Sequence, residues 1–153
     1  MFLLPWLAAT VSAAEIQSGL VLGYGTSLRP DTSQISWSAV GGMSMAFFEQ
    51  PFYGTAGVDL LVVKLPPGSA FFPEVIGGPG LAPWGRWGPH AALLVGAGAR
   101  LTGVMAEVGA QLGVGLGPVQ IDLQHRRGWQ SYEPDLFRAN TLQISVHFDL
   151  EVT

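Results

Sequence analysis

The feature that most constrains this chain is a strict alternation of apolar residues with small or polar ones. In residues 104–116, every second residue is Val, Ala or Leu, and those between are mostly Gly, Gln and Glu. Side chains repeat every two residues in a β-strand and every 3.6 in a helix. The pattern therefore predicts strands. The same alternation predicts further strands at 16–28, 35–48, 55–64, 91–101, 119–124 and 141–150.

The two faces of these strands differ in a way that indicates their environment. One face is uniformly apolar, while the other carries mainly Gly, Ser and Gln with an occasional charge. The water-facing side of a soluble sandwich or lipocalin-like barrel should be rich in charges. Here only 12% of all residues are charged, against about 25% in soluble domains, and Lys64 is the only lysine. Small residues suit the interior of a narrow barrel and the apolar face suits lipid.

The strand lengths and number point to one architecture. Strands of about 10–13 residues match the roughly 9–11 that a tilted membrane strand needs, and only a closed sheet leaves no unpaired edge in a bilayer. Bacterial barrels have an even number of strands. Seven are visible, so we expect the eighth within 65–89, with 69–77 as the best segment although it contains Pro73. We predict an all-β fold, an antiparallel up-and-down transmembrane β-barrel of eight strands in the bacterial outer membrane.

The first fourteen residues do not fit the strand pattern. Residues 1–14, MFLLPWLAATVSAA, are apolar and end in small residues, and about fourteen residues are too few to span a bilayer as a helix. They predict a cleaved export signal, with a buried N-terminal strand or helix as the alternative. Residues 15–153 are then one barrel domain. Export without any cysteine is typical of a bacterial periplasmic or outer-membrane protein.

Composition and spacing argue against several other functions. The net charge is -4 and the pI about 5.1, which offers no basic patch for nucleic acid. His90, His125 and His147 lack metal-ligand spacing, so we expect no metal. The Gly-rich segments lie in strands or turns and do not open a helix, so we expect no dinucleotide or other cofactor.

The face assigned to the barrel interior also carries charged and titratable residues. We expect these side chains to pair with one another and fill the lumen, because a buried charge without a partner is costly. A proton or ion path is the alternative. The predicted lumen network consists of Asp59, Arg100, Glu107, Asp122, Arg126, His147 and Asp149.

His125 continues the apolar face and is predicted to point outward near the membrane surface. It precedes what we interpret as the longest loop, residues 128–137. With Ser131 and Glu133 or Asp135, it could form a hydrolytic triad that acts on a lipid. The simpler interpretation, which we favour, is an interfacial histidine beside a wet polar loop with no catalytic residue.

Aromatic residues gather near the predicted strand ends, where interfacial girdles belong. Loop aromatics that pack on one another would give the same pattern. The residues are Phe47, Phe48, Phe52, Tyr53, Trp84, Trp87, Trp129, Tyr132 and Phe137.

The C-terminal half resembles a known family. The segments PHAALLVGAGARL, EVGAQLGVGLGPVQIDLQHRRGW and NTLQISVHFDL, within about 89–150, are similar to the bacterial outer-membrane β-barrel domain often labelled porin-like. In that family a strand led by proline, with a Gly-Ala-Gly centre, precedes a strand that residues 121–128 match here. The usual terminal aromatic residue is absent, since the chain ends DLEVT. The resemblance implies a membrane barrel inserted by the barrel-assembly machinery.

A weaker resemblance is to the lipid A deacylase barrels. These carry an outward His followed two residues later by a nucleophilic Ser. His125 fits the first position, but Arg127 stands at the second. This resemblance implies at most an inactive relative of such enzymes.

Taken together, the sequence predicts a small, non-enzymatic outer-membrane barrel with a filled lumen. Its role would be structural or adhesive, through loops at 29–34 and 128–137 and contacts with outer-membrane lipid and lipopolysaccharide. One alternative is a lipid A-modifying enzyme that uses His125. The other is a soluble periplasmic barrel with its faces reversed, binding an apolar ligand inside.

Overall fold

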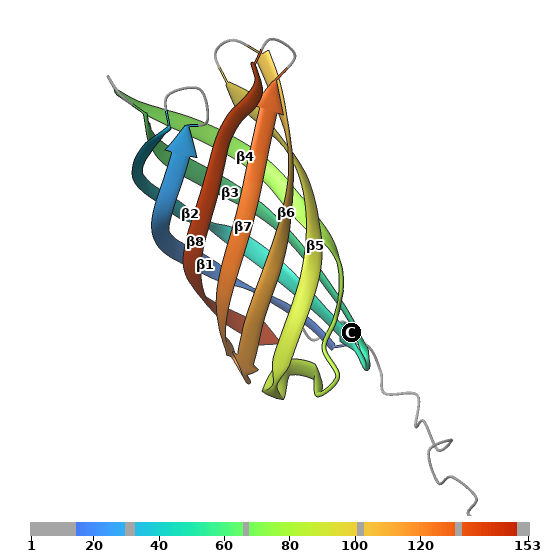
Figure 1. Cartoon of the computed structure of the whole chain (residues 1–153). Helices are drawn as coiled ribbons and strands as arrows, with labels where there is room; N and C mark the ends of the chain where they lie inside the picture. Colours follow the sequence, from blue (N-terminus) through green and yellow to red (C-terminus); the bar gives the residue numbers. More distant parts are fainter. Residues whose placement is uncertain (1–14, 30–32, 66–67, 101–102, 131–132, 150–153) are drawn as a thin grey trace, which may run out of the picture.

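A computed structural model of the chain describes residues 15–29, 33–65, 68–100, 103–130 and 133–149. These residues form a closed barrel in which each strand pairs antiparallel with the next and β8 pairs with β1 (Figure 1). The prediction of an eight-stranded up-and-down barrel is confirmed. The strands are β1 (Glu15–Arg29), β2 (Gln34–Glu49), β3 (Phe52–Leu65), β4 (Gly68–Leu81), β5 (Pro89–Arg100), β6 (Gly103–Leu116), β7 (Val119–Gln130) and β8 (Glu133–Asp149).

The two faces of the strands point in the directions that the sequence predicts, with the polar face toward the lumen and the apolar face outward. On β6, Glu107 and Gln111 are buried in the lumen, while Val104 and Leu112 point outward with 74% and 63% of their surface exposed. The side chains of β7 divide in the same way, with Asp122 inside and Leu123 outside. The polar face is therefore the interior of the barrel, which excludes the reversed arrangement with an apolar ligand site inside.

The eighth strand lies where the sequence places it, and it is longer than expected. β4 covers residues 68–81 and pairs with β3 along its whole length. Its pairing with β5 is limited to residues 74–77 and 80–81. Pro73 and Pro79 adjoin those two runs, and a proline has no N–H to donate to a ladder. The β4–β5 pair is thus interrupted beside both prolines.

Two predicted turns are wrong in their extent. The segment 128–137, predicted as a long loop, belongs largely to β7 and β8, with Gln130 paired to Glu133 across the hairpin. The gap between the predicted strands 35–48 and 55–64, which implies a turn at 49–54, is a turn only around Gln50 and Pro51, since β3 already begins at Phe52. Polar and aromatic residues mask the alternation at both places, although the ladders reach Gln130 and Glu133 in the first segment and Glu49 and Phe52 in the second.

The two ends of the barrel differ. The start of β1 and the end of β8 lie at one end, which we call the terminal end, together with a short 3-10 turn η1 (Gly85–Trp87) between β4 and β5 (Figure 1). The hairpins β1–β2, β3–β4, β5–β6 and β7–β8 lie at the other end, which we call the hairpin end. The predicted export signal, residues 1–14, lies outside the described residues. Among those described, no helix is long and apolar enough to cross a membrane.

The aromatic prediction holds only for part of its residues. Phe47, Phe52, Trp84 and Trp87 are exposed at the terminal end, as a girdle requires. Phe48 and Tyr53, which follow Phe47 and Phe52 in the sequence, point inward by alternation and are buried in the lumen. Phe137 on β8 is buried there as well. Trp129 is half-buried on the outer face of β7, and Tyr132 lies outside the described residues.

Candidate functional site

The lumen is filled by side chains arranged in layers. An apolar cluster that includes Phe72, Met105 and Phe137 occupies the part near the hairpin end. A second apolar cluster, with Phe48 and Leu94, occupies the part near the terminal end. Buried polar residues lie between and around these clusters. The polar layers are where the sequence predicts a network of charges.

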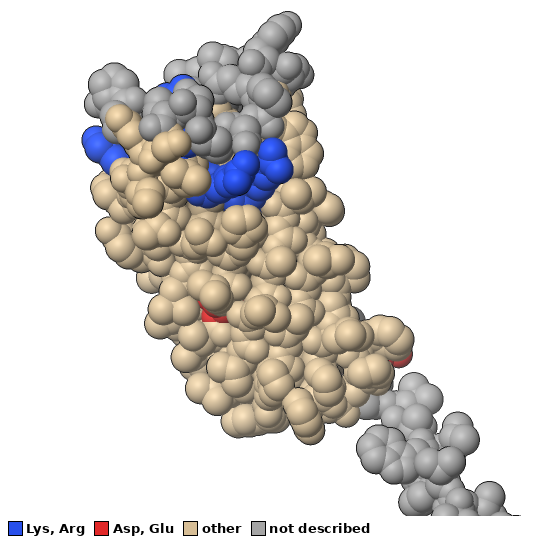
Figure 2. All heavy atoms as spheres, in the orientation of Figure 1, with Lys and Arg blue, Asp and Glu red and all other residues tan. Residues whose placement is uncertain are grey.

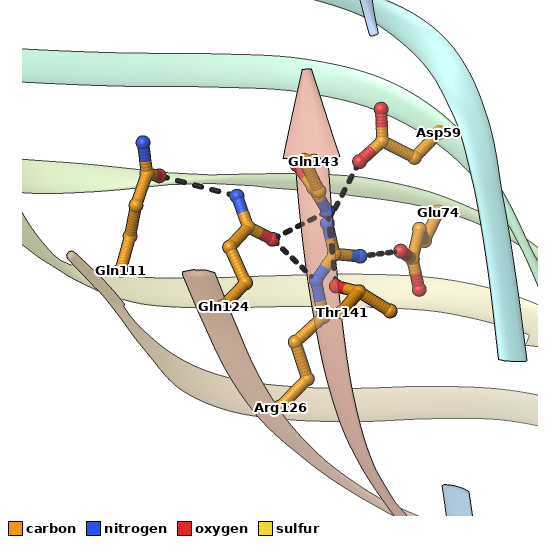
Figure 3. Close-up of polar contacts among 7 residues, drawn as sticks. All are labelled: Asp59, Glu74, Gln111, Gln124, Arg126, Thr141 and Gln143. Atoms are coloured by element: carbon orange, nitrogen blue, oxygen red, sulfur yellow. Dashed lines mark hydrogen bonds and ion pairs between the residues drawn. The ribbon is translucent and has the colours of Figure 1, made fainter. Parts of the chain in front are cut away.

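The centre of the network is Arg126 on β7, whose surface is 0% exposed. Its Nη2 donates to Asp59 Oδ2 over 2.9 Å, and its Nη1 is bonded to Glu74 Oε1 (Figure 3). Asp59 and Glu74 are direct partners across the β3–β4 ladder. Two like charges facing each other in this way repel, and the guanidinium that reaches across the barrel offsets that repulsion.

A third carboxyl group lies in the same cluster. Glu107 on β6 is 2% exposed and interacts electrostatically with Arg126, Glu74 and Asp59. Its two carboxylate oxygens, together with Asp59 Oδ1 and Glu74 Oε2, are buried without a hydrogen-bond partner. One guanidinium therefore faces three carboxyl groups, and its removal would leave all of them without a counter-charge.

A chain of amides continues from Arg126 toward the terminal end. Arg126 Nε donates to Gln124 Oε1 over 2.8 Å, and that oxygen also accepts from Gln143 Nε2 over 2.9 Å (Figure 3). Gln124 Nε2 in turn donates to Gln111 Oε1 over 3.2 Å. A cavity of about 20 Å³ lies beside these amides, with Ser44, Thr55 and Asp59 also lining it. That is space for about one water molecule.

A histidine and a carboxyl group form a second pair in the same lumen, separate from Arg126. His90 Nε2 is 2.6 Å from Asp122 Oδ1, and both residues are buried. The ring of Tyr53 packs on His90 with 4.9 Å between ring centroids. His147 lies in the same layer and contacts Ser44, with 2.9 Å between Nε2 and Oγ.

Asp149 does not belong to the buried network, so its predicted place is wrong. Its side chain is 64% exposed at the terminal end, although its ladder partner Gln17 is 1% exposed. There it accepts hydrogen bonds from Gln17 Nε2 over 2.8 Å and from Arg86 Nη1 over 2.9 Å. Arg86 also lies 3.5 Å from Glu15, so the η1 turn is tied to both terminal strands. Such exposed pairs contribute little stability.

Glycines across the ladder make room for the lumen charges. A Cβ at Gly42 would lie 2.4 Å from Asp59 Oδ1, and a Cβ at Gly113 would lie 2.0 Å from Asp122 Oδ1. The register places a glycine opposite each buried charge: Gly42 with Asp59, Gly98 with Glu74, Gly96 with Glu107, Gly113 with Asp122 and Gly109 with Arg126. The glycines on this face therefore leave the space that the larger polar side chains occupy.

The structure brings some members of the predicted network together and not others. Asp59, Glu107 and Arg126 form one cluster, while Asp122 and His147 lie in a separate layer. Arg100 ends β5, and its side chain lies outside the described part of the chain. Two central residues, Glu74 and His90, are missing from the prediction. Extending the alternation across Pro73 and back to Pro89 would have found both.

His125 points outward from β7, as predicted, and is exposed. Its Nδ1 lies 2.8 Å from Oδ1 of Asn140, its neighbour across the β7–β8 ladder. Ser131 is outside the described residues, and only the backbone of Glu133 is described. The triad therefore remains an untested hypothesis, and the one partner described for His125 is an amide.

Lys and Arg side chains gather at the hairpin end, in view near the top of Figure 2, while most of the described surface below them is uncharged. Arg127 and Arg138 face each other across the β7–β8 ladder near this end, and Lys64 lies near the end of β3. Exposed acidic residues at the terminal end include Glu15, Glu49 and Asp149. Among the residues that the structure describes, no cluster of His, Asp and Glu is arranged to hold a metal ion.

Comparison with known proteins gives a structural match without a sequence match. No protein-family model and no curated protein matches the sequence. The crystal structure of Ail, the attachment invasion locus protein of Yersinia pestis, matches with a TM-score of 0.62 and 14% identity, over 88% of this chain and 99% of Ail. The backbone structure of the same outer membrane protein in a phospholipid bilayer nanodisc matches with a TM-score of 0.52 and 13% identity, over 86% of this chain and 99% of that one. At this identity, the match shows the fold.

Proposed function

We propose that this chain is a non-enzymatic protein of the bacterial outer membrane, with a sealed lumen and a structural or surface-contact role. The observation that carries the proposal is that the barrel is polar inside and apolar outside, the reverse of a soluble protein. Its interior holds Arg126 and buried carboxylates, while its outer face presents large apolar side chains such as Leu22, Ile35 and Leu93, each at least 70% exposed. A soluble monomer rarely exposes an apolar surface of this extent.

Further observations support the same proposal. The barrel has no unpaired edge, which is the condition for a sheet in a bilayer. Residues 1–14 would direct export, and the barrel-assembly machinery would insert the chain. Ail, which has the same fold, is named for attachment and invasion. A contact role for this chain would rest on the tips of its hairpins, since residues 128–130 and 133–137 are strand and not loop.

The proposal predicts a heat-modifiable barrel in the outer-membrane fraction. A closed barrel without a free sheet edge should stay folded in detergent until it is boiled, so unboiled protein should migrate differently from boiled protein on a denaturing gel. The measurement is membrane fractionation followed by paired boiled and unboiled lanes. Soluble protein without a band shift would contradict the membrane assignment, because the apolar outer face would then have to be covered in some other way.

The filled lumen predicts that the protein does not conduct ions like a porin. The layers from Phe137 through Arg126 and Gln124 to Leu94 leave a described cavity of only about 20 Å³ between them. Purified protein in a planar lipid bilayer should therefore give no stable open-channel steps. Regular ohmic steps in the wild-type protein would contradict the sealed lumen and favour the ion-path alternative.

A further inference from the structure

We propose that the buried side chains of Glu74 and Glu107 share one proton, which makes the pair a pH-sensitive link between β4 and β6 inside the lumen. The proposal concerns the interior of the barrel, so it goes beyond the membrane location and surface role proposed above. Three observations carry it: two carboxyl groups that approach each other, oxygens without a donor among the described residues, and an excess of negative charge around them.

The two carboxyl groups come from the strands on either side of β5. Glu74 pairs with Gly98 of β5, and Glu107 pairs with Gly96 two residues earlier on the same strand. A Cβ at Gly96 would lie 2.4 Å from Glu107 Oε1. A Cβ at Gly98 would lie 3.2 Å from the Cβ of Glu74. Because β5 presents no side chain at these two positions, the glutamates extend over it and come within hydrogen-bonding range of each other.

Their oxygens lack the donor that such a contact needs. Glu74 is 3% exposed and Glu107 is 2% exposed. Arg126 bonds to Glu74 Oε1, whereas Glu74 Oε2 and both carboxyl oxygens of Glu107 have no hydrogen-bond partner among the described residues (Figure 3). Two ionised carboxylates are both acceptors, so they cannot bond to each other, but a protonated carboxyl group has one O–H to donate. One proton between the pair turns the contact into a hydrogen bond.

The charges around the pair favour the same state. The pair faces Asp59 from β3 and Arg126 from β7, while β8 contributes the uncharged Thr141 and Gln143 to this polar layer. With all three carboxyl groups ionised, a single guanidinium would leave two negative charges unbalanced in a closed lumen. One shared proton leaves only one. Because a buried charge without a partner is costly, the protonated pair is the more stable arrangement.

Infrared spectroscopy of the purified full-length protein, folded in detergent at neutral pH, tests for the proton. Wild type should show the C=O stretching band of a protonated carboxylic acid. The variant Glu107→Gln should lose this band, because the amide N–H of the new side chain replaces the shared proton and leaves Glu74 ionised. Glu74→Gln should lose it for the same reason. The matched variant Glu49→Gln, at an exposed glutamate of the terminal end, should keep it.

The pH dependence of unfolding provides a second readout. The folded chain holds a proton that an unfolded glutamate releases above about pH 5, so the stability of the wild type should fall as the pH rises. The urea midpoint should therefore shift to lower concentration between about pH 5 and pH 9, and the shift should be smaller in Glu107→Gln. His90, Asp122 and His147 also titrate in the lumen, but they are common to both proteins, so the comparison removes their contribution.

The contrary results are equally definite. Absence of the band in the folded wild type overturns the proposal, since the glutamates would then be ionised or balanced by a cation. A band that persists in Glu107→Gln and Glu74→Gln belongs to another carboxyl group, and its loss in Glu49→Gln removes the assignment to the lumen. Equal midpoint shifts in wild type and Glu107→Gln also overturn it. A heat-modifiability gel shows that each sample is closed, and membrane fractionation tests the proposed function separately.

Discussion

Replacing Arg126 with Met should destabilise the barrel by about 3–5 kcal/mol, the usual cost of removing one partner of a buried ion pair. Arg126 is fully buried and binds both Asp59 and Glu74, with Glu107 also in its field. Met keeps much of the side-chain volume but leaves three carboxyl groups without a counter-charge in the lumen. The measurement is the free energy of unfolding from urea titrations in lipid vesicles, followed by tryptophan fluorescence.

A rescue variant separates lost charge balance from lost packing. Adding Asp59→Asn and Glu74→Gln to Arg126→Met removes two of the stranded charges at nearly constant volume. This triple variant should recover a large part of the lost stability, since a buried ion pair replaced as a whole is often close to neutral. Equal destabilisation of the single and triple variants would show that Arg126 acts through packing alone.

Replacing Gly25 with Leu should prevent closure of most of the barrel population. Gly25 faces the lumen on β1 and pairs with Thr141 of β8, in the strand pair that closes the sheet. A Cβ at this position would lie 1.8 Å from the carbonyl oxygen of Asn140 and 2.7 Å from the Cα of Thr141. The obstacle is backbone, which cannot move without breaking ladder hydrogen bonds. The cost should exceed the roughly 1–3 kcal/mol typical of overpacking.

The matched control for this variant is Gly41→Leu on the neighbouring strand β2. Gly41 faces outward, and the nearest atom to a Cβ there is Leu22 Cδ2 at 3.6 Å, an ordinary contact. The fraction of heat-modifiable protein after refolding into detergent micelles measures closure. It should fall sharply for Gly25→Leu and stay near the wild-type value for Gly41→Leu. Similar fractions for the two variants would contradict the close approach of β1 and β8.

The errors of sequence reasoning have identifiable physical causes. β4 was predicted too short and Glu74 was overlooked because Pro73 interrupts the strand signal, although Pro73 faces outward and leaves the β3–β4 ladder intact. Residues 128–137 resemble a loop because polar and aromatic residues mask the alternation, yet β7 reaches Gln130 and β8 begins at Glu133. Asp149 fits the alternation but is the last residue of β8 and has a 64% exposed side chain, and alternation does not reveal how far along the barrel a residue lies.

The sequence alone determined the class of fold and the face on which each strand residue lies, because the period of two is a local property of the extended backbone. Hence Arg126 and Asp59 could be assigned to the interior and His125 to the exterior before any strand was paired. Only the tertiary structure decided which side chains meet, since contacts such as Arg126 with Asp59, 67 residues apart, depend on barrel closure and on register. The same closure pairs Leu22 with Ile144 on β1 and β8, two strands joined only when the first meets the last.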